Sequence, residues 1–291
     1  MLFLGTAAAE QFPNPFCGCE TCQRTRSSGD SRDFRRRSSF RLDEETLIDF
    51  NADTLFASSQ YRSPLTGLQN LFVTHMHEDH FDYWNMEFLN MSVTPCKPLQ
   101  VYLSPEAAEG FSEACRLLRK APFDQMREQF FRMEKVYELH PLPFYETVKV
   151  GEMLATPMRG RHEGFFNGEH SANFVFERPS GNVMYASDTG RFYGETLEWL
   201  QNRHLDVLVI EGSFGLMEAP YDCGHMTLQS LTETLEALYG QGTLDQSSRV
   251  YVTHIAHKGG LLHGEYERLL QERFGKQVML AYDGLEIPET K

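Results

Sequence analysis

The chain alternates short apolar runs with segments of helical periodicity. The runs are short enough to be strands and cover residues 71–74, 183–187, 207–210, 250–253 and 277–282. Leucines recur at spacings of three and four over residues 227–239, which predicts an amphipathic helix, and residues 265–274 show a similar pattern. Strands and helices that alternate along a chain indicate an α/β fold in layers.

One long segment departs from this alternation. Residues 105–138 have a helical pattern and are rich in large apolar side chains, namely Phe123, Met126, Phe130, Phe131 and Met133. We predict a helical insertion here, which is either a lid or homodimer face, or a helix that packs its own apolar side on the sheet. Because the chain shows no linker, low-complexity tract or solenoid repeat, we expect one domain over residues 1–291.

Four potential metal ligands, His75, His77, Asp79 and His80, directly follow the apolar run 71–74. If the strand continues, His75 and His77 point to the same side, because side chains alternate along a strand. Asp79 and His80 come later, where a turn can bring them toward a second metal. Two metals about 3.5–4 Å apart can hold both an attacking hydroxide and a leaving oxygen. The spacing therefore predicts a metal site rather than four structural residues.

Three cysteines, Cys17, Cys19 and Cys22, lie within six residues. Cysteines this close seldom all form disulfides. With a distant histidine, their spacing is typical of a tetrahedral structural zinc site. His257 is the candidate for the fourth ligand, and the alternative is three free thiols in a loop.

The cluster at residues 75–80 resembles the HxHxDH signature of the metallo-β-lactamase superfamily. The resemblance implies a four-layer αββα sandwich, here with a small N-terminal zinc knuckle and a helical insertion. It also implies later ligands at or near the ends of strands, and His162, Asp188 and His254 follow apolar runs in the expected order. By this resemblance one metal is held by His75, His77 and His162, the other by Asp79, His80 and His254, and Asp188 bridges the two.

Both groups together resemble the phosphoribosyl cyclic phosphodiesterases of phosphonate breakdown, the PhnP family. The most specific points are the CGCxxC group at residues 17–22 and the THIxH group at residues 253–257. In that family the fourth zinc ligand stands at the place of His257. The resemblance also makes His225 and Asp79 candidate catalytic residues.

Three further features bear on the comparison with these families. Asp49 resembles the carboxylate that commonly closes an early strand in the superfamily. The chain departs from the PhnP pattern in a longer segment over residues 103–154 and in Glu211, where relatives often carry aspartate. Both departures bear on the substrate more than on the fold.

The implied function is hydrolysis of a small cyclic phosphodiester by a metal-bound hydroxide. Its cofactors are two divalent metals, manganese or zinc, and one structural zinc. His225 would donate a proton to the leaving alkoxide or orient the phosphate, and its alternative is a residue beside the start of the helix at 227–239. Other functions that the pattern allows are a cyclic-nucleotide phosphodiesterase, a tRNA 3′-end nuclease, a lactonase, or a non-hydrolytic cofactor-biosynthesis protein like the pyrroloquinoline-quinone B group.

The composition is that of an ordinary globular protein. Hydrophobic residues make up 41% of the 291 residues and charged residues 23%. No apolar run approaches the roughly 20 residues that span a bilayer, so we expect no membrane partner. Thiols placed for zinc indicate a reducing compartment, which points to the cytoplasm.

The charge balance bears on partners. The formal net charge is −14, from 27 basic against 41 acidic residues, which disfavours nucleic acid as a partner. Six arginines near the N-terminus form a local exception, and we expect them to pair with nearby acids rather than to bind phosphate: Arg24, Arg26, Arg32, Arg35, Arg36 and Arg37. His140, His204 and His263 have no ligand spacing and are expected at the surface.

Overall fold

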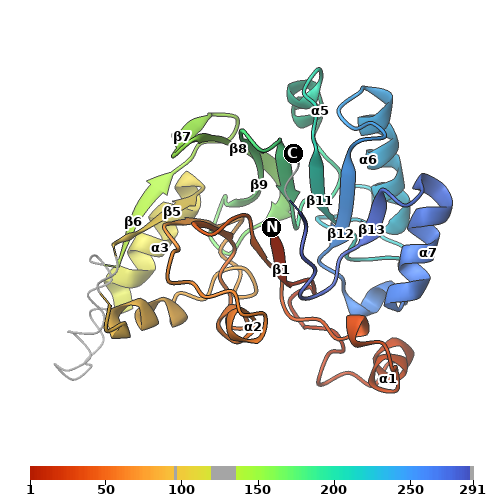
Figure 1. Ribbon diagram of the computed structural model, residues 1–291, viewed down its shortest axis with the longest axis horizontal. Coiled ribbons are helices and arrows are strands. Elements are labelled where there is room, and N and C mark those ends of the chain that lie inside the picture. Colours follow the sequence, from red (N-terminus) through yellow and green to blue (C-terminus); the bar gives the residue numbers. More distant parts are fainter. Residues whose placement is uncertain (95–96, 119–135, 289–291) are drawn as a thin grey trace.

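The computed structural model describes residues 1–94, 97–118 and 136–288. Two sheets pack face to face, with helices on their outer faces (Figure 1). The N-terminal half of the chain builds one sheet, and the C-terminal half builds the other together with its helices. This arrangement confirms the predicted αββα layers.

The first sheet has the strand order β1-β2-β3-β4-β5-β6. The pairs β1–β2 and β2–β3 are antiparallel, whereas β3 to β6 are parallel. Its strands are β1 (Leu2–Gly5), β2 (Ser39–Arg41), β3 (Thr46–Ile48), β4 (Asn70–Phe72), β5 (Leu99–Leu103) and β6 (Tyr137–Pro141).

The second sheet has the strand order β13-β12-β11-β10-β9-β8-β7. Strands β10 to β13 are parallel, and β7 to β10 are joined by antiparallel pairs. Its strands are β7 (Val148–Val150), β8 (Met153–Glu163), β9 (His170–Glu177), β10 (Val183–Ala186), β11 (Val207–Glu211), β12 (Arg249–Thr253) and β13 (Val278–Leu280).

The helices cover the outer faces of both sheets. On the first sheet these are α2 (Thr54–Gln60) and α3 (Pro105–Leu118), and on the second α5 (Gly194–Leu200), α6 (Leu228–Gly240) and α7 (His263–Phe274). The short helix α1 (Glu20–Arg26) lies beside the turn η4 (His257–Gly259), and two further turns are η1 (Ser31–Asp33) and η2 (Asn85–Met91). Among the described residues, no helix has both the length and the apolar character needed to cross a membrane.

The central strands are buried on both faces, which explains their continuous apolar runs. In β10, Val183 and Tyr185 point into the layer between the sheets, whereas Met184 and Ala186 pack against the helices. Strand β11 alternates in the same way. Because both faces of these strands are occupied by apolar packing, polar chemistry is confined to the strand ends and the loops after them.

Most of the predicted elements are present. The five predicted runs overlap β4, β10, β11, β12 and β13, and the two predicted helices are α6 and α7. The predicted insertion, residues 105 to about 138, is helical as α3 up to Leu118, and β6 begins at Tyr137 and pairs with β5. The Phe- and Met-rich part, residues 119–135, lies outside the described residues, so its role as a lid or dimer face stays a prediction.

Candidate functional site

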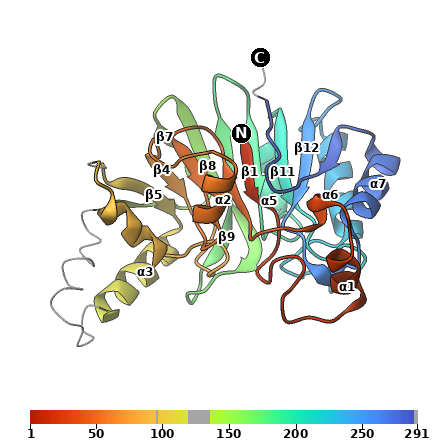
Figure 2. The same cartoon turned by 60° about the horizontal axis from the view of Figure 1, so that its bottom comes forward.

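Polar side chains from both sheets meet at the carboxyl ends of the parallel strands. Asp49 follows β3, Asp188 comes two residues after β10, Glu211 ends β11 and His254 follows β12. Figure 2 turns this end of the molecule toward the viewer. Parallel strands bring their carboxyl ends to one edge, so residues far apart in sequence converge there.

The loop after β4 carries the HxHxDH motif. The expectation that His75 and His77 lie on the strand is wrong, because β4 ends at Phe72. The loop is instead held by buried carboxylates: the backbone N–H of Thr74 donates to Asp49 and that of Met76 donates to Glu169, each at 2.8 Å. These bonds place His75 Nε2 3.0 Å from His77 Nδ1 without help from strand alternation.

His162 completes the first group of ligands. It was expected after an apolar strand, but it lies inside β8, within the stretch of shifted register between Arg159 and Glu163. A bulge of this kind re-aims side chains near a site. His162 Nε2 lies 3.2 Å from His77 Nδ1. His75, His77 and His162 therefore offer three converging ring nitrogens that could hold one metal ion.

The second group is formed by Asp79, His80, Asp188 and His254, all of them buried. Nε2 of His80 lies 2.7 Å from Asp188 Oδ2 and 3.1 Å from Asp79 Oδ2. Asp188 Oδ1 lies 3.0 Å from His254 Nδ1, and its Oδ2 is 3.4 Å from His75 Nε2. Asp188 thus stands between the two groups, at the position predicted for a bridging carboxylate.

The chemistry of these atoms fits a cation. Asp49 Oδ2 lies 2.7 Å from His80 Nδ1 and fixes that nitrogen as a donor, so Nε2 is the ring atom that faces the cluster. Because Nε2 faces two carboxylates, it must carry either a proton or a metal. His80 Nε2, Asp188 Oδ1 and His254 Nε2 are buried without a hydrogen bond among the described residues, although buried polar atoms are nearly always bonded. The buried His and Asp groups fit a dinuclear centre.

The two groups differ in their electrostatics. Burial lowers the pKa of His162 to about 4 and that of His75 well below its ordinary value, so both rings are neutral near pH 7. Neutral imidazole is the form that binds metals. Burial would raise the pKa of Asp188, but the positive charges of His254, His80 and His225 hold it well below its usual range. The carboxylate of Asp188 is therefore ionised.

The backbone at the cluster is strained. Asp49, Asp188 and His254 have φ values of +60°, +49° and +58°, in the left-handed region that residues other than glycine seldom adopt. Such conformations cost on the order of 1–3 kcal/mol each and persist where the surrounding structure enforces them. Asp188 and His254 belong to the cluster, and Asp49 orients one of its histidines.

His225 lies beside the second group and is held by carboxylates. Its Nδ1 is 3.2 Å from Asp188 Oδ1 and 3.3 Å from Glu211 Oε2. Burial opposes protonation of this ring, but the negative charges of Glu211 and Asp188 prevail and raise its pKa to about 11. Nε2 makes no hydrogen bond within the described chain, and His225 lines an adjacent cavity. The ring can therefore hold a proton beside the cluster, and it can also serve as a metal ligand.

Two buried glutamates have positional roles that the sequence did not reveal. Glu211, noted there only as a departure, accepts hydrogen bonds from the backbone N–H groups of Thr189 and Gly190 at 2.7 and 2.8 Å, and so fixes the loop after Asp188. Glu169 bonds the backbone of Met76, as described above. A carboxylate that accepts hydrogen bonds only from the backbone has no partner side chain at a fixed spacing in the sequence, so the role of Glu169 could not be predicted. A role for Glu211 could have been suspected, because this residue ends a strand.

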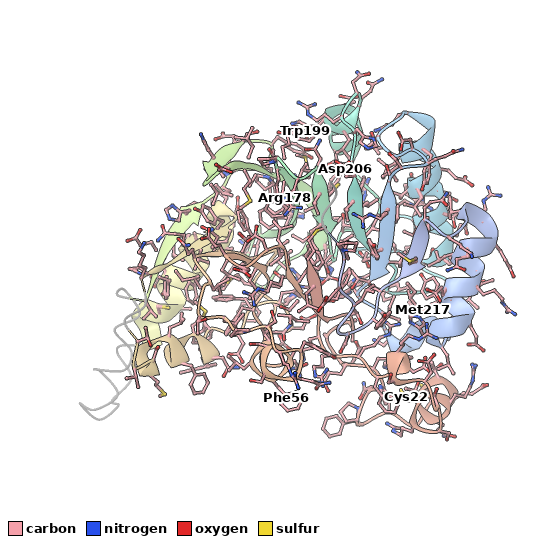
Figure 3. The ribbon with its side chains drawn as sticks, in the orientation of Figure 1. Cys22, Phe56, Arg178, Trp199, Asp206 and Met217 are labelled. Atoms are coloured by element: carbon pink, nitrogen blue, oxygen red, sulfur yellow. The ribbon has the colours of Figure 1, made fainter. Side chains whose placement is uncertain are left out.

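The cysteine group also converges. Cys17, Cys19, Cys22 and His257 place one ligand atom each within 4.8 Å of one another, and Cys19 Sγ lies 3.4 Å from His257 Nδ1. Cys22 lies in α1, at the lower edge of the molecule in Figure 3. Backbone hydrogen bonding within the group, followed by the His257 contact, lowers the pKa of the Cys19 thiol to about 6. A thiolate is the metal-binding form, so this group can hold a structural metal.

Four of the six arginines near this knuckle pair with acids, as predicted, whereas Arg26 donates to backbone carbonyls and Arg35 forms no ion pair within the described chain. Arg24 contacts Glu265, and ion pairs also join Arg32 to Asp30 and Glu267, Arg36 to Asp283, and Arg37 to Asp53. The expectation that His263 lies at the surface is wrong, because its side chain is buried. Its Nδ1 lies 2.8 Å from the buried Arg35 guanidinium, which docks the N-terminal segment on α7.

The two candidate metal groups share one loop. His254 belongs to the dinuclear cluster and His257, three residues later, to the cysteine group. Between them Ile255 donates its N–H to Thr6 O at 2.9 Å and accepts from Ala8 N–H at 3.1 Å. The N-terminal segment therefore fixes the backbone next to His254 before it continues to the cysteines.

Comparison with known proteins agrees with this geometry. The family model described as "Beta-lactamase superfamily domain" matches residues 46–255. No curated protein shows significant sequence similarity. Among solved structures, a diphosphatase of the PhnP family has a TM-score of 0.71 at 20% identity, covering 99% of this chain and 98% of that one. Zinc-bound PqqB from Methylobacterium extorquens has a TM-score of 0.72 at 18% identity, with 99% of both chains covered.

The human short-form tRNase Z, ELAC1, is similar over 99% of this chain and 98% of its own, with a TM-score of 0.62 at 16% identity. At these identities the likenesses establish the fold alone. The family model covers most of the chain, including the ligand groups from His75 to His254. The chain therefore belongs to the metallo-β-lactamase superfamily.

Proposed function

We propose that the protein is a metal-dependent hydrolase that opens a small cyclic phosphodiester. The observation that carries the proposal is the position of His225, whose Nδ1 lies within 3.3 Å of Glu211 and Asp188 while its ring also lines a cavity. A sugar alkoxide is a poor leaving group, so its departure depends on a proton donor at this place. A centre that only bound a metal would not require one.

Seven residues would hold the metals: His75, His77 and His162 on one side, Asp79, His80 and His254 on the other, and Asp188 between them. Two divalent cations there would lower the pKa of a bound water toward about 7 and polarise a phosphoryl oxygen. Manganese and zinc both suit these ligands. Asp79, whose Oδ2 lies 3.7 Å from His254 Nε2, can also accept a hydrogen bond from the attacking water.

The rest of the cluster orients these groups. Asp49 fixes the tautomer of His80, and Glu211 fixes both the loop after Asp188 and the ring of His225. Burial of the carboxylates keeps bulk water from competing for them. The similar PhnP-family structure is that of a diphosphatase, which supports phosphate chemistry on this fold.

The test is a substrate panel on protein of defined metal content. The panel contains ribose cyclic phosphates, cyclic nucleotides, bis-p-nitrophenyl phosphate, a lactone and a tRNA precursor. We expect cyclic phosphodiesters to be hydrolysed with the highest kcat/KM, and the tRNA precursor to remain intact because the chain carries a net charge of −14. Preferred turnover of the lactone, or no turnover of any substrate by fully metallated protein, would refute the proposal.

A further inference from the structure

A cavity of about 810 Å³ opens directly beside the candidate active site. Its walls are the loop after β11, the N-terminal half of α6, and Arg191, and His225 belongs to both the cavity and the cluster. Figure 3 shows Met217 of this loop at the lower end of the second sheet. A group that leaves the phosphorus toward His225 therefore enters this cavity.

The loop that forms the wall is held in place. Leu216 donates its N–H to Gly259 O at 3.0 Å, and Leu228 donates to Gly215 O at 2.7 Å. At Gly215, with φ of +42°, a Cβ would come within 2.6 Å of the Gly259 oxygen. The loop nevertheless presents large side chains to solvent, because Leu216 is 60% exposed and Tyr221 70% exposed. Exposed apolar side chains at a cavity are typical of binding sites.

The charges of the wall decide what kind of group fits. Arg191 is paired with Glu233 and lies 4.5 Å from the centroid of the Tyr221 ring, and Arg273 is paired with Glu236. With Glu218, the lining carries three glutamates against two arginines. The cavity therefore offers no uncompensated positive charge for a second phosphate. It offers instead an aromatic ring, a guanidinium plane and an aliphatic side chain, which suit a flat, uncharged group.

We propose that this cavity is the subsite for a flat aromatic group on the alcohol side of the phosphodiester, such as a nucleobase. The inference rests on the proposed function and names its substrate class. Because His225 stands between the metal ligands and the cavity, the alcohol side of a phosphodiester seated at these ligands extends past His225 toward Tyr221. Tyr221 is then a residue that selects substrates by stacking.

The experiment compares two cyclic phosphates of ribose, one with a base and one without. For Tyr221→Ala, we expect the KM of the base-bearing substrate to rise by about 5- to 100-fold, the range that base–aromatic stacking supports, with kcat little changed. Tyr221→Phe keeps the ring and should restore the KM. The matched control is Phe56→Ala, because Phe56 is also exposed (64%) beneath an arginine but lies on α2, outside the cavity.

A second measurement does not need turnover. Binding of a nucleoside monophosphate and of ribose phosphate to the metallated protein is followed by calorimetry, in the original chain and in Tyr221→Ala. Tighter binding of the base-bearing ligand that is lost in Tyr221→Ala supports the subsite even if no phosphodiester is hydrolysed, which would refute only the proposed function. Equal binding of both ligands, or an equal loss for both in Tyr221→Ala, would overturn the subsite.

Discussion

The dinuclear cluster and the cysteine knuckle are built in opposite ways. The cluster draws its side chains from strand ends of both sheets, is buried, and opens beside His225 on a cavity. The knuckle takes three ligands from six consecutive residues around a short helix, and Cys17 and Cys19 are half-buried. Its four candidate ligands would complete the tetrahedral set of a structural metal, which would leave no position for a substrate. One centre is suited to chemistry and the other to holding a segment in place.

The two centres therefore relate to the fold in opposite ways. The fold assembles the cluster, whereas the knuckle stabilises a part of the fold. The cluster is assembled by the sheets, so removing one ligand should cost activity more than stability. The knuckle ties an otherwise irregular segment to η4 and α7, so removing one ligand should cost stability more than activity. The loop from His254 to His257 links both effects, because it carries a ligand of each centre.

The largest expected effect is at the cluster. His77→Ala should lower turnover of cyclic phosphodiesters by roughly 10³-fold or more, because a three-nitrogen position loses one ligand. The melting temperature of the apoprotein should change little. Turnover at matched metal content and thermal denaturation measure the two quantities, with His204→Ala as the control because His204 lies outside both centres. Near-normal turnover would show that the cluster is not the active centre.

The second effect separates chemistry from metal binding within the cluster. His225→Ala should reduce hydrolysis of a ribose cyclic phosphate by about 10²–10⁴-fold, the usual contribution of a positioned acid. Bis-p-nitrophenyl phosphate should lose far less, because its leaving group is stable as an anion. Equal losses on both substrates would instead make His225 a metal-holding or phosphate-positioning residue. No loss of rate on either substrate would mean that His225 has no catalytic role and only lies beside the start of α6.

The third effect is at the knuckle, where we expect a larger loss of stability than of activity. Cys19→Ser should lower the melting temperature by roughly 10 °C and remove one equivalent of zinc, because a structural metal contributes directly to folding. The rate per folded molecule at saturating metal should stay within about 3-fold. The affinity of the metal position at His254 should weaken more than that at His75, since only His254 shares the knuckle loop.

The control for this change is Cys115→Ser, because Cys115 is a half-buried thiol outside both groups. Zinc content is measured on the purified protein, and metal affinities by competition with a chelator. An unchanged zinc content in Cys19→Ser would end the assignment of a structural metal to these cysteines.

The smallest effect concerns how the N-terminal segment is docked. Burial, with the positive charges of Arg35 and Arg32, lowers the pKa of His263 from its ordinary 6.5 to about 3. The folded state therefore keeps this ring neutral, whereas the unfolded chain protonates it below pH 6.5. Its contribution to stability is present above pH 6.5 and is lost as the pH falls, at about 1 kcal/mol per pH unit.

His263→Gln should flatten this loss. We expect the free energy of unfolding to fall by about 1 kcal/mol more in the original chain than in His263→Gln between pH 6.5 and 5.5. Denaturant unfolding at the two pH values measures the difference, and His204→Gln should leave the slope as it is. Identical slopes for the original chain and His263→Gln would show that the ring is not held neutral.

Short-range sequence patterns predict much of the structure of this protein. The HxHxDH and CGCxxC groups were recognisable because their ligands lie a few residues apart, and the central strands because burial on both faces requires continuous apolar runs. The amphipathic helix α6 followed from leucine spacing alone. Local patterns thus indicated an α/β fold and the ligand groups at residues 17–22 and 75–80, and the family resemblance that these groups carry implied the αββα sandwich and the later ligands.

The tertiary structure decided what no local pattern encodes. Glu211 and Glu169 act by bonding the backbone of residues far away in sequence, and His263 is buried only because Arg35 and α7 meet across the molecule. The cavity beside His225 exists because the loop after β11 is bonded to Gly259. Each of these features depends on contacts between distant segments, and such contacts form only when the sheets pack and bring the strand ends together.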